Sequence, residues 1–408
     1  MAMSGRSRSC PTRISLYESS VFDPSPFICH RRLRNTPSHP YYDLVFFKSF
    51  FLLGTMEDLT KWYKIKVCAE SCAKVVNEIE IHPLWRGQLP LNASYAALGC
   101  DLYCFGGERP SSSFVPSSEV YKLVSNFPIS NESWIRMPSM KAPRVGARIL
   151  VLDGKIYVVG GHRFFLGRQN DKQRVGVSAR TLEAQASPVV EVFDPTTGEW
   201  KALPPLPIPL PFESKYTCAA LENPNRILLI ASLSRTTGAL VFCQYYVHQA
   251  CWKMLNKVHI DCPLGKKPLT AANIQYWLTV DSILGKNAIT AGSTLYWLTG
   301  DSKLVAYDEV QDVWLLGQLK GQGISFLECD SCDEPHPSQK CSLIHLQGER
   351  FAMVQCESCT DVEVQCVIFD VYRQPCNKRF GLGISLVSLH KCKTEIDSFV
   401  SDCFVLGK

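Results

Sequence analysis

The stretch VLDGKIYVVGGH, residues 151–162, is an apolar strand that ends abruptly at a glycine pair, Gly160 and Gly161. Glycine weakens a strand by up to about 1 kcal/mol relative to alanine, because it has no side chain to pack and loses more chain entropy. Such a pair is therefore expected where the backbone must bend, or must approach a neighbour that a Cβ atom would strike. The stretch predicts a strand that runs close to another strand and turns sharply at its end.

A second copy of the pattern precedes the first: ALGCDLYCFGGE, residues 97–108, ends at Gly106 and Gly107. After each pair come a variable loop, a third apolar strand, a polar turn and a tryptophan, Trp134 in one copy and Trp200 in the other. Each copy therefore reads as four short strands separated by turn residues. Four antiparallel strands repeated about every fifty residues are typical of β-propeller blades.

Tryptophan recurs farther along the chain, at Trp252 and Trp314, and also near the start at Trp85. An indole ring that lies in the seam between neighbouring sheets buries about 150–250 Å². At roughly 25 cal/mol per Å², this burial contributes about 4–6 kcal/mol as an upper bound. The seam therefore outweighs the cost of the glycines that allow the strands to approach.

The order of these features, apolar strand, Gly-Gly, Tyr/Phe-Asp and Trp-x-x-Leu/Met-Pro, resembles the kelch repeat of the galactose-oxidase-like propeller superfamily. The resemblance covers residues 62–406 and is sharpest at 94–138 and 146–205. The later repeats depart from the pattern, because they lack the glycine pair, and the fifth offers Phe380 where tryptophan is expected. The departing segments are ILLIASLS (227–234), LYWLTGDS (295–302) and RFAMVQCESC (350–359).

The resemblance implies an all-β, kelch-type propeller of six blades over residues 61–408. A ring must seal its last blade, because open strand edges invite aggregation. We expect one blade to be assembled from both termini. Its strands are expected at 383–390 and 399–407 from the end of the chain, and at 62–68 and 76–85 from its beginning.

One tandem duplication complicates the number of blades. GKKPLTAANIQYWLTVDSIL, residues 265–284, aligns without a gap with GKNAITAGSTLYWLTGDSKL, residues 285–304. Twenty residues make a hairpin rather than a blade, so we expect one copy to lie in a surface connection. The alternative is a seventh, incomplete blade.

Residues 1–60 are expected to form a disordered or basic leader, with Met56 as an alternative start. Residues 1–55 hold seven Lys and Arg against three acidic residues, or +4 of the net charge of +5. The near-neutral remainder argues against nucleic-acid binding by bulk charge. Leu44 to Leu53 is too short and too polar to span a bilayer.

The expected location is the cytoplasm, the nucleus or both, with organelle targeting by residues 1–55 as the alternative. Without a recognisable secretory signal, most of the nineteen cysteines are expected to be buried thiols in a reducing compartment.

The longest loop between second and third strands spans residues 162–187 and combines arginines with aromatic side chains, the usual anchors of interfaces. One interpretation is a docking loop for an acidic protein segment, and the other is a solvated insertion. The candidate partner-binding residues are His162, Arg163, Phe164, Phe165, Arg168, Arg174 and Arg180.

Two Cys-x-x-Cys pairs near the C-terminus have a spacing close to that of zinc knuckles: Cys329 with Cys332, and Cys356 with Cys359. The alternative is a chance pattern in a cysteine-rich chain. The same region resembles the metal-binding segment of nitrile-specifier proteins, which carry Glu-x₃-Asp-x₃-His on a kelch fold. In this chain Glu328, Cys332 and His336 keep that spacing with cysteine in place of the aspartate, so no metal or other cofactor is assigned.

The resemblance implies a non-catalytic adaptor that binds a protein partner through the loops of one propeller face. Members of the family often serve in ubiquitin ligases, with an F-box or BTB domain as companion. Residues 1–60 show no amphipathic helical pattern for such a domain. We expect a monomeric propeller, with a metal-dependent kelch-fold enzyme as the alternative.

Overall fold

The computed structural model of the protein describes seventeen segments, and the account that follows concerns these residues. They are 41–51, 58–68, 75–83, 85–87, 89–90, 92–108, 116–123, 134–161, 189–207, 216–232, 240–255, 288–299, 303–319, 341–356, 363–376, 379–394 and 399–405.

The described chain is built from short β-strands and one 3-10 turn, η2 (Val247–Gln249). The strands form six sheets, and each consecutive pair within a sheet is antiparallel except at β3. The closing sheet contains β25 (Phe399–Val405), β1 (Tyr41–Phe51), β2 (Asp58–Cys68) and β4 (Trp85–Gly87). The first sheet contains β5 (Ser94–Leu98), β6 (Asp101–Phe105), β7 (Val120–Leu123) and β8 (Trp134–Met137). The second contains β9 (Arg148–Leu152), β10 (Lys155–Val159), β11 (Val190–Asp194) and β12 (Glu199–Ala202).

The other three sheets continue the same order. The third contains β13 (Tyr216–Leu221), β14 (Arg226–Ser232), β15 (Leu240–Tyr246) and β16 (Cys251–Leu255). The fourth contains β17 (Ile289–Ala291), β18 (Thr294–Leu298), β19 (Lys303–Asp308) and β20 (Val313–Gln318). The fifth contains β21 (Cys341–Gln347), β22 (Arg350–Cys356), β23 (Glu363–Cys376) and β24 (Arg379–Lys393), with β3 (Val75–Glu80) beside β24.

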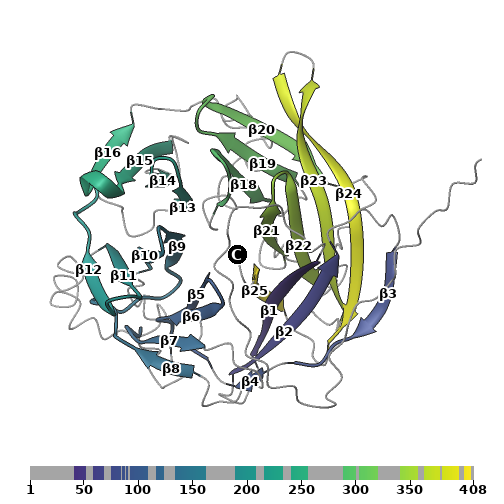
Figure 1. The fold of residues 1–408 in the computed structure, drawn as a ribbon, viewed down its shortest axis with the longest axis horizontal. Coiled ribbons are helices and arrows are strands. Elements are labelled where there is room, and N and C mark those ends of the chain that lie inside the picture. The colour runs from purple at the N-terminus through teal and green to yellow at the C-terminus, as the bar shows by residue number, and fades with distance from the viewer. Residues whose placement is uncertain are drawn as a thin grey trace, which may run out of the picture.

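The six sheets surround a common axis (Figure 1). The innermost strands contact one another in a closed cycle, β25 to β5, β9, β13, β17, β21 and back to β25. The prediction of an all-β propeller is therefore confirmed, and the described strands supply six sheets, the expected number. The second copy of the tandem duplication forms β17, β18 and the start of β19 in the fourth sheet, whereas the first copy lies outside the described residues.

The hydrophobic core lies in the seams between neighbouring sheets. One buried cluster joins the first and second sheets through Tyr103, Phe105, Ile156 and Phe193, with Trp200 packed against it. Similar clusters join the second sheet to the third, the third to the fourth and the fourth to the fifth. The second strands of the sheets, such as β6 and β10, are thus buried on both faces, which explains why they are apolar runs with little alternation.

The closing sheet is assembled from both ends of the chain, but not from all the expected segments. β1 pairs with β2 along its whole length and with β25 on its other side. The expected leader therefore does not extend to residue 60, because residues 41–51 form the second strand of this sheet. The side chains of Leu44 and Phe46 in this strand, β1, are fully buried. A run such as YYDLVFFKSFF, too short for a membrane span, is long enough for a propeller strand.

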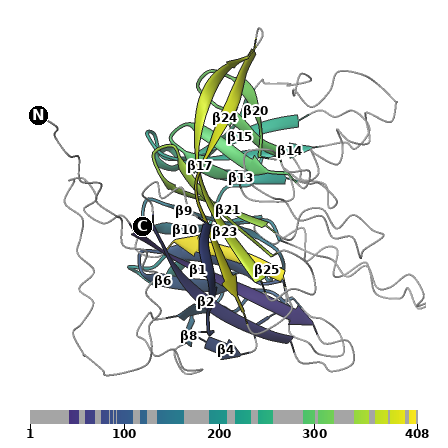
Figure 2. The same cartoon turned by 90° about the vertical axis from the view of Figure 1, so that its right-hand side faces the viewer.

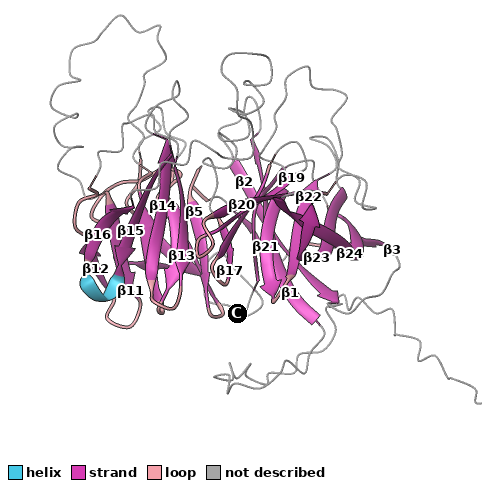
Figure 3. Cartoon of the chain, turned by 90° about the horizontal axis from the view of Figure 1, so that it is seen from above, coloured by secondary structure: helices cyan, strands magenta, loops and turns pink. Residues whose placement is uncertain are grey.

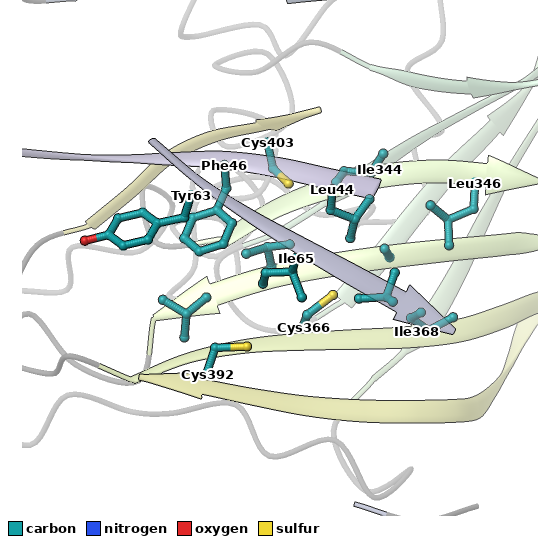
Figure 4. Close-up of a cluster of buried hydrophobic side chains, with 14 of the residues drawn as sticks. Leu44, Phe46, Tyr63, Ile65, Ile344, Leu346, Cys366, Ile368, Cys392 and Cys403 are labelled. Carbon is teal, nitrogen blue, oxygen red and sulfur yellow. The ribbon is translucent and has the colours of Figure 1, made fainter. Parts of the chain in front are cut away.

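Figure 4 shows the seam that β1 completes. Leu44, Phe46 and Ile65 of the closing sheet face Cys366 and Ile368 of the fifth sheet, all in one buried cluster. The cluster ties the two ends of the chain to each other through side chains as well as through the β1–β25 ladder.

Two segments expected in the closing sheet belong to the fifth sheet instead. Residues 383–390 lie inside β24, and residues 75–80 form β3, which runs parallel to the end of β24. The outer strand of the closing sheet is the short β4, which pairs with Thr60–Trp62 of β2. The expectation was wrong because β24, which is 15 residues long, is itself the fourth strand of the fifth sheet. It contains no tryptophan to mark that position.

The long hairpin of β23 and β24 reaches beyond its own sheet and lies against β20 of the fourth sheet (Figures 1 and 2). At the contact, a Cβ atom added to Gly317 would come within 2.8 Å of the Leu382 Cβ atom. Arg373 of β23 also pairs with Asp308 and Gln311 of the fourth sheet. This hairpin, the β23–β24 arm, packs across the outer strand of the neighbouring sheet.

Candidate interaction face

One end of the sheets carries the connections from second to third strands and those that lead into the next sheet, because turns alternate ends in an antiparallel meander. We call this end the interaction face. In the first sheet, the described chain reaches it at Gly106–Glu108 and returns at Pro116–Ser117, and in the second at Gly160–Gly161 and Val189. The short turn η2 lies at the opposite end (Figure 3).

Both glycine pairs adopt a left-handed backbone at this face, with φ of +61° at Gly106 and +63° at Gly160. Residues other than glycine rarely adopt this backbone conformation, since their Cβ atom crowds the backbone. Space is lacking as well: a Cβ atom on Gly106 would strike the carbonyl oxygen of Arg144, and one on Gly160 would strike the hydroxyl of Tyr216. The pairs thus answer the question raised by the sequence, because each lets a strand turn sharply against a neighbouring segment.

Arg144 lies between the two glycine pairs, in the connection from the first to the second sheet, and only 1% of it is exposed. Its backbone carbonyl accepts a hydrogen bond from Gly107 N at 2.8 Å, and its own N–H donates to Ser117 O at 2.9 Å. The main chain of Arg144 therefore holds both stems of the connection 109–115.

The guanidinium of Arg144 holds the stems of the next connection. Nη1 donates to the carbonyl oxygens of Gly160 and, at 3.2 Å, Val189, which flank residues 162–188. Gly160 N also donates to Val189 O at 2.8 Å. One arginine thus fixes the bases of two adjacent connections on the interaction face.

Glu191, which is fully buried, neutralises Arg144. Its Oε1 accepts from Nη2 at 2.7 Å and from Nε at 3.2 Å, while its two oxygens also accept from the N–H groups of Lys141 and Ala142. Burial lowers the pKa of the Arg144 guanidinium, and the hydrogen bonds and charge of Glu191 oppose that shift. A buried ion pair is stable only when such additional bonds satisfy both groups.

Tyr216 of the third sheet braces the second glycine pair from the other side. Its hydroxyl donates to Val159 O at 3.1 Å and accepts from Gly161 N at 3.2 Å. Burial raises the pKa of the Tyr216 hydroxyl to about 12, so it remains a donor at neutral pH. The guanidinium of Arg148 lies over its ring, 5.8 Å from the centroid. The second and third sheets thus meet at the stems of the connection 162–188.

The tryptophans of the repeats lie in the seams and reach back to the preceding sheet. Trp200 Nε1 donates to Pro138 O at 2.8 Å, and Trp252 Nε1 donates to Pro204 O at 3.1 Å. Each acceptor is the proline of the preceding Trp-x-x-Leu/Met-Pro motif. The ring centroid of Trp134 lies 6.2 Å from that of Trp62 in the closing sheet, and Trp314 packs against the third sheet.

The buried cysteines act as small apolar residues. Burial raises the thiol pKa of Cys104 and of Cys218 to about 12, and it also raises that of Cys366. These thiols are therefore not thiolates at neutral pH.

The expected docking residues of the loop 162–187 lie outside the described residues, and so do Glu328, Cys329, Cys332, His336 and Cys359. For Cys356, which ends β22, only the backbone is described. Among the residues that the structure describes, no group of three or more His, Cys, Asp or Glu side chains could hold a metal ion. Nor is any helix in the described segments long and apolar enough to cross a membrane.

Arg144 and Glu191 were not singled out from the sequence. Their signal was available: the connection APRVG contributes an arginine just before an inner strand, and β11 contributes an acidic side chain, Glu191, between Val190 and Val192. A charge in such a run indicates a buried partner, since an unpaired buried charge is too costly.

Comparison with known proteins supports the repeat that forms the second sheet. A family model described as the Kelch motif matches residues 143–207, which contain β9–β12. An F-box/kelch-repeat protein of Arabidopsis thaliana is 28% identical over 154 residues, 38% of this chain and 33% of the relative. Beta-scruin of Limulus polyphemus is 28% identical over 138 residues, 33% of this chain and 13% of the relative.

A human protein named kelch repeat and BTB domain-containing protein 13 is 31% identical over 132 residues, 31% of this chain and 24% of the relative. The matched part of the chain thus spans about a third or less of each of these relatives.

Proposed function

Because the chain is a kelch-repeat β-propeller, we propose that it is a non-catalytic scaffold that binds a protein partner through its interaction face. The observation that carries the proposal is the Arg144–Glu191 network, a buried ion pair that fixes the stems of two adjacent connections. Short turns would close the same strands without it. Rigid stems that present variable loops are a common design for binding surfaces.

The loop 162–187 is the proposed contact region, because it combines four arginines at positions 163, 168, 174 and 180 with Phe164 and Phe165. Arginine and aromatic side chains are enriched where interfaces bind most tightly. The proposed partner is an acidic protein segment, since opposite charge speeds association and selects partners.

A role in ubiquitin-ligase pathways is the finer proposal. Its support is that relatives are named for F-box and BTB domains beside their kelch repeats. In this role the propeller would recognise the partner, in the cytoplasm or nucleus.

The test is affinity capture from native tissue with two matched deletions. In one variant a Gly-Ser linker replaces residues 163–187, and in the control a linker replaces residues 125–131, which connect β7 to β8 at the opposite end. We expect the first deletion to abolish capture of specific partners and the control to retain them. If both variants capture the same partners as the intact chain, the proposed binding site is wrong.

Two further measurements sharpen the test. Reversing Arg163, Arg168, Arg174 and Arg180 to glutamate is expected to weaken capture and remove its salt dependence if the partner is acidic. Metal analysis of the purified protein tests the non-catalytic assignment: stoichiometric zinc or iron that is lost in a Cys332→Ser/Cys356→Ser variant would contradict it.

A further inference from the structure

The outer edge of β24 differs from the outer edges of the other sheets. The outer strands β4, β8, β12 and β16 are three to five residues long, and each carries at least one Arg, Lys or Glu. Short length and charge are the usual protection of a strand edge against pairing with another chain. β20 has six residues and no charge, but the β23–β24 arm packs against it.

β24 has 15 residues, and no charged residue or proline occurs from Phe380 to Leu389. The chain itself adds a strand to this edge, because β3 pairs with it in parallel over Leu389–Lys393. Within the described segments, no strand pairs with that edge before residue 389. An extra residue, Val387, forms a bulge opposite Ile368 and Phe369 and ends the regular stretch. The edge from Gly381 to Leu386 is therefore long, regular and uncharged.

The side chains along this stretch alternate so that two antiparallel copies of the strand would be complementary to each other. Leu382, Ile384 and Leu386 point to one face, and Gly383 and Ser385 to the other. If two such strands ran antiparallel about a twofold axis at Ile384, Leu382 would lie opposite Leu386, and Gly383 opposite Ser385. Apolar side chains would then face apolar ones, small residues would face small ones, and no like charges would meet.

In place of the monomer expected from the sequence, we propose that β24 pairs antiparallel with β24 of a second copy of this chain, joining two fifth sheets into one continuous sheet. A twofold axis makes the same surface serve both copies, so the edge needs to be complementary only to itself. Main-chain hydrogen bonds supply the affinity of such strand addition. The arrangement also explains Leu386, 37% exposed on an otherwise buried face, because Leu382 of the second copy would cover it.

The experiment is sedimentation equilibrium of the full chain from about 0.1 to 100 μM, a range that brackets a Kd of about 1 μM, which corresponds to about −8.2 kcal/mol. The intact protein is expected to rise from its monomer mass of 45.8 kDa to twice that value. The double variant Ser385→Lys/Leu386→Lys, which places charge on exposed positions of the edge, is expected to remain monomeric. Met254→Lys, at a 53% exposed position on the outer strand β16, is the matched control and is expected to dimerise.

A mass that stays at 45.8 kDa for the intact chain, or a dimer that persists in the double variant, would overturn the proposal. If the double variant does not fold, hydrogen exchange of the intact protein decides. The amides of Gly381–Leu386 are then expected to exchange about fourfold to sevenfold more slowly at 100 μM than at 1 μM for a micromolar Kd, whereas those of β16 are unchanged. Equal exchange at the two concentrations would contradict the pairing.

Discussion

The second and fifth sheets solve the same packing problem in different ways. The second sheet packs on the first through an indole ring that donates to a proline carbonyl, while Arg144 and Glu191 lock the glycine turns between the two. Among its described residues, the fifth sheet shows none of these features. It packs on the fourth through a buried apolar cluster, the β23–β24 arm and the partly exposed Arg373–Asp308 pair. A repeat can therefore lack the glycine pair and the tryptophan and still pack in the ring, if other side chains fill the interface with the neighbouring sheet.

The largest expected contrast between the two sheets concerns their ion pairs. Glu191→Gln leaves the buried guanidinium of Arg144 without a countercharge, so we expect a loss of about 3–5 kcal/mol in the free energy of unfolding, measured by urea denaturation. The matched variant in the fifth sheet is Asp370→Asn, which breaks the half-exposed pair with Arg350 and should cost less than about 1 kcal/mol. Equal losses in the two variants would contradict the distinction.

A buried histidine in the fifth sheet gives that region its own pH dependence. His390 is 2% exposed, and burial lowers its pKa from 6.5 to about 4. The unfolded chain binds more protons between these values, so stability falls as pH drops from 6.5 to 4, by up to about 3 kcal/mol. Urea denaturation across this range should show the slope, and His390→Gln should remove its part of it.

The control for this prediction is His248→Gln, which replaces an exposed histidine in η2 in the same way and measures the effect of such a substitution elsewhere in the chain. A slope that is undiminished in His390→Gln would contradict a role for this histidine in the acid response.

The glycine turns of the first and second sheets provide a narrower test. Gly106 and Gly198 both have positive φ, at +61° and +72°, but only Gly106 has backbone in the way of a Cβ atom. Gly198→Ala should cost about 1–2 kcal/mol for the left-handed backbone alone. Gly106→Ala should cost about 1–3 kcal/mol more, because the Arg144 carbonyl must move. Similar melting temperatures for the two variants would show that conformation, not close approach, requires the glycine.

The smallest expected effect lies at the contact of the arm. Gly317→Ala would press on the Leu382 Cβ atom, and we expect a loss of about 1–3 kcal/mol, near the lower end because a hairpin can shift more easily than a core strand. The measurement is the melting temperature together with exchange of the β23–β24 amides. Faster exchange in the whole ring, rather than in the arm, would contradict a local contact.

How much the sequence could predict differs between the same regions. The repeats at 94–138 and 146–205 could be recognised because their glycines, tryptophans and turns each leave a local trace. The β23–β24 arm could not be recognised from the sequence, because its packing on β20 depends on Gly317 and Leu382. These two residues are far apart in sequence and match no motif. Residues 41–51 were missed for a related reason: their partner β25 lies at the other end of the chain. Arg144 and Glu191 act through each other, and neither is conspicuous alone.

The central claim is that β1 and β25 close the ring. The most direct measurement is hydrogen exchange at the β25 amides of Cys403–Val405 in two shortened chains, one beginning at Met56, which lacks β1, and one beginning at Ser38, which keeps it. We predict that β25 loses its protection in the first chain and keeps it in the second. Equal protection of β25 in both chains would contradict the closure described here.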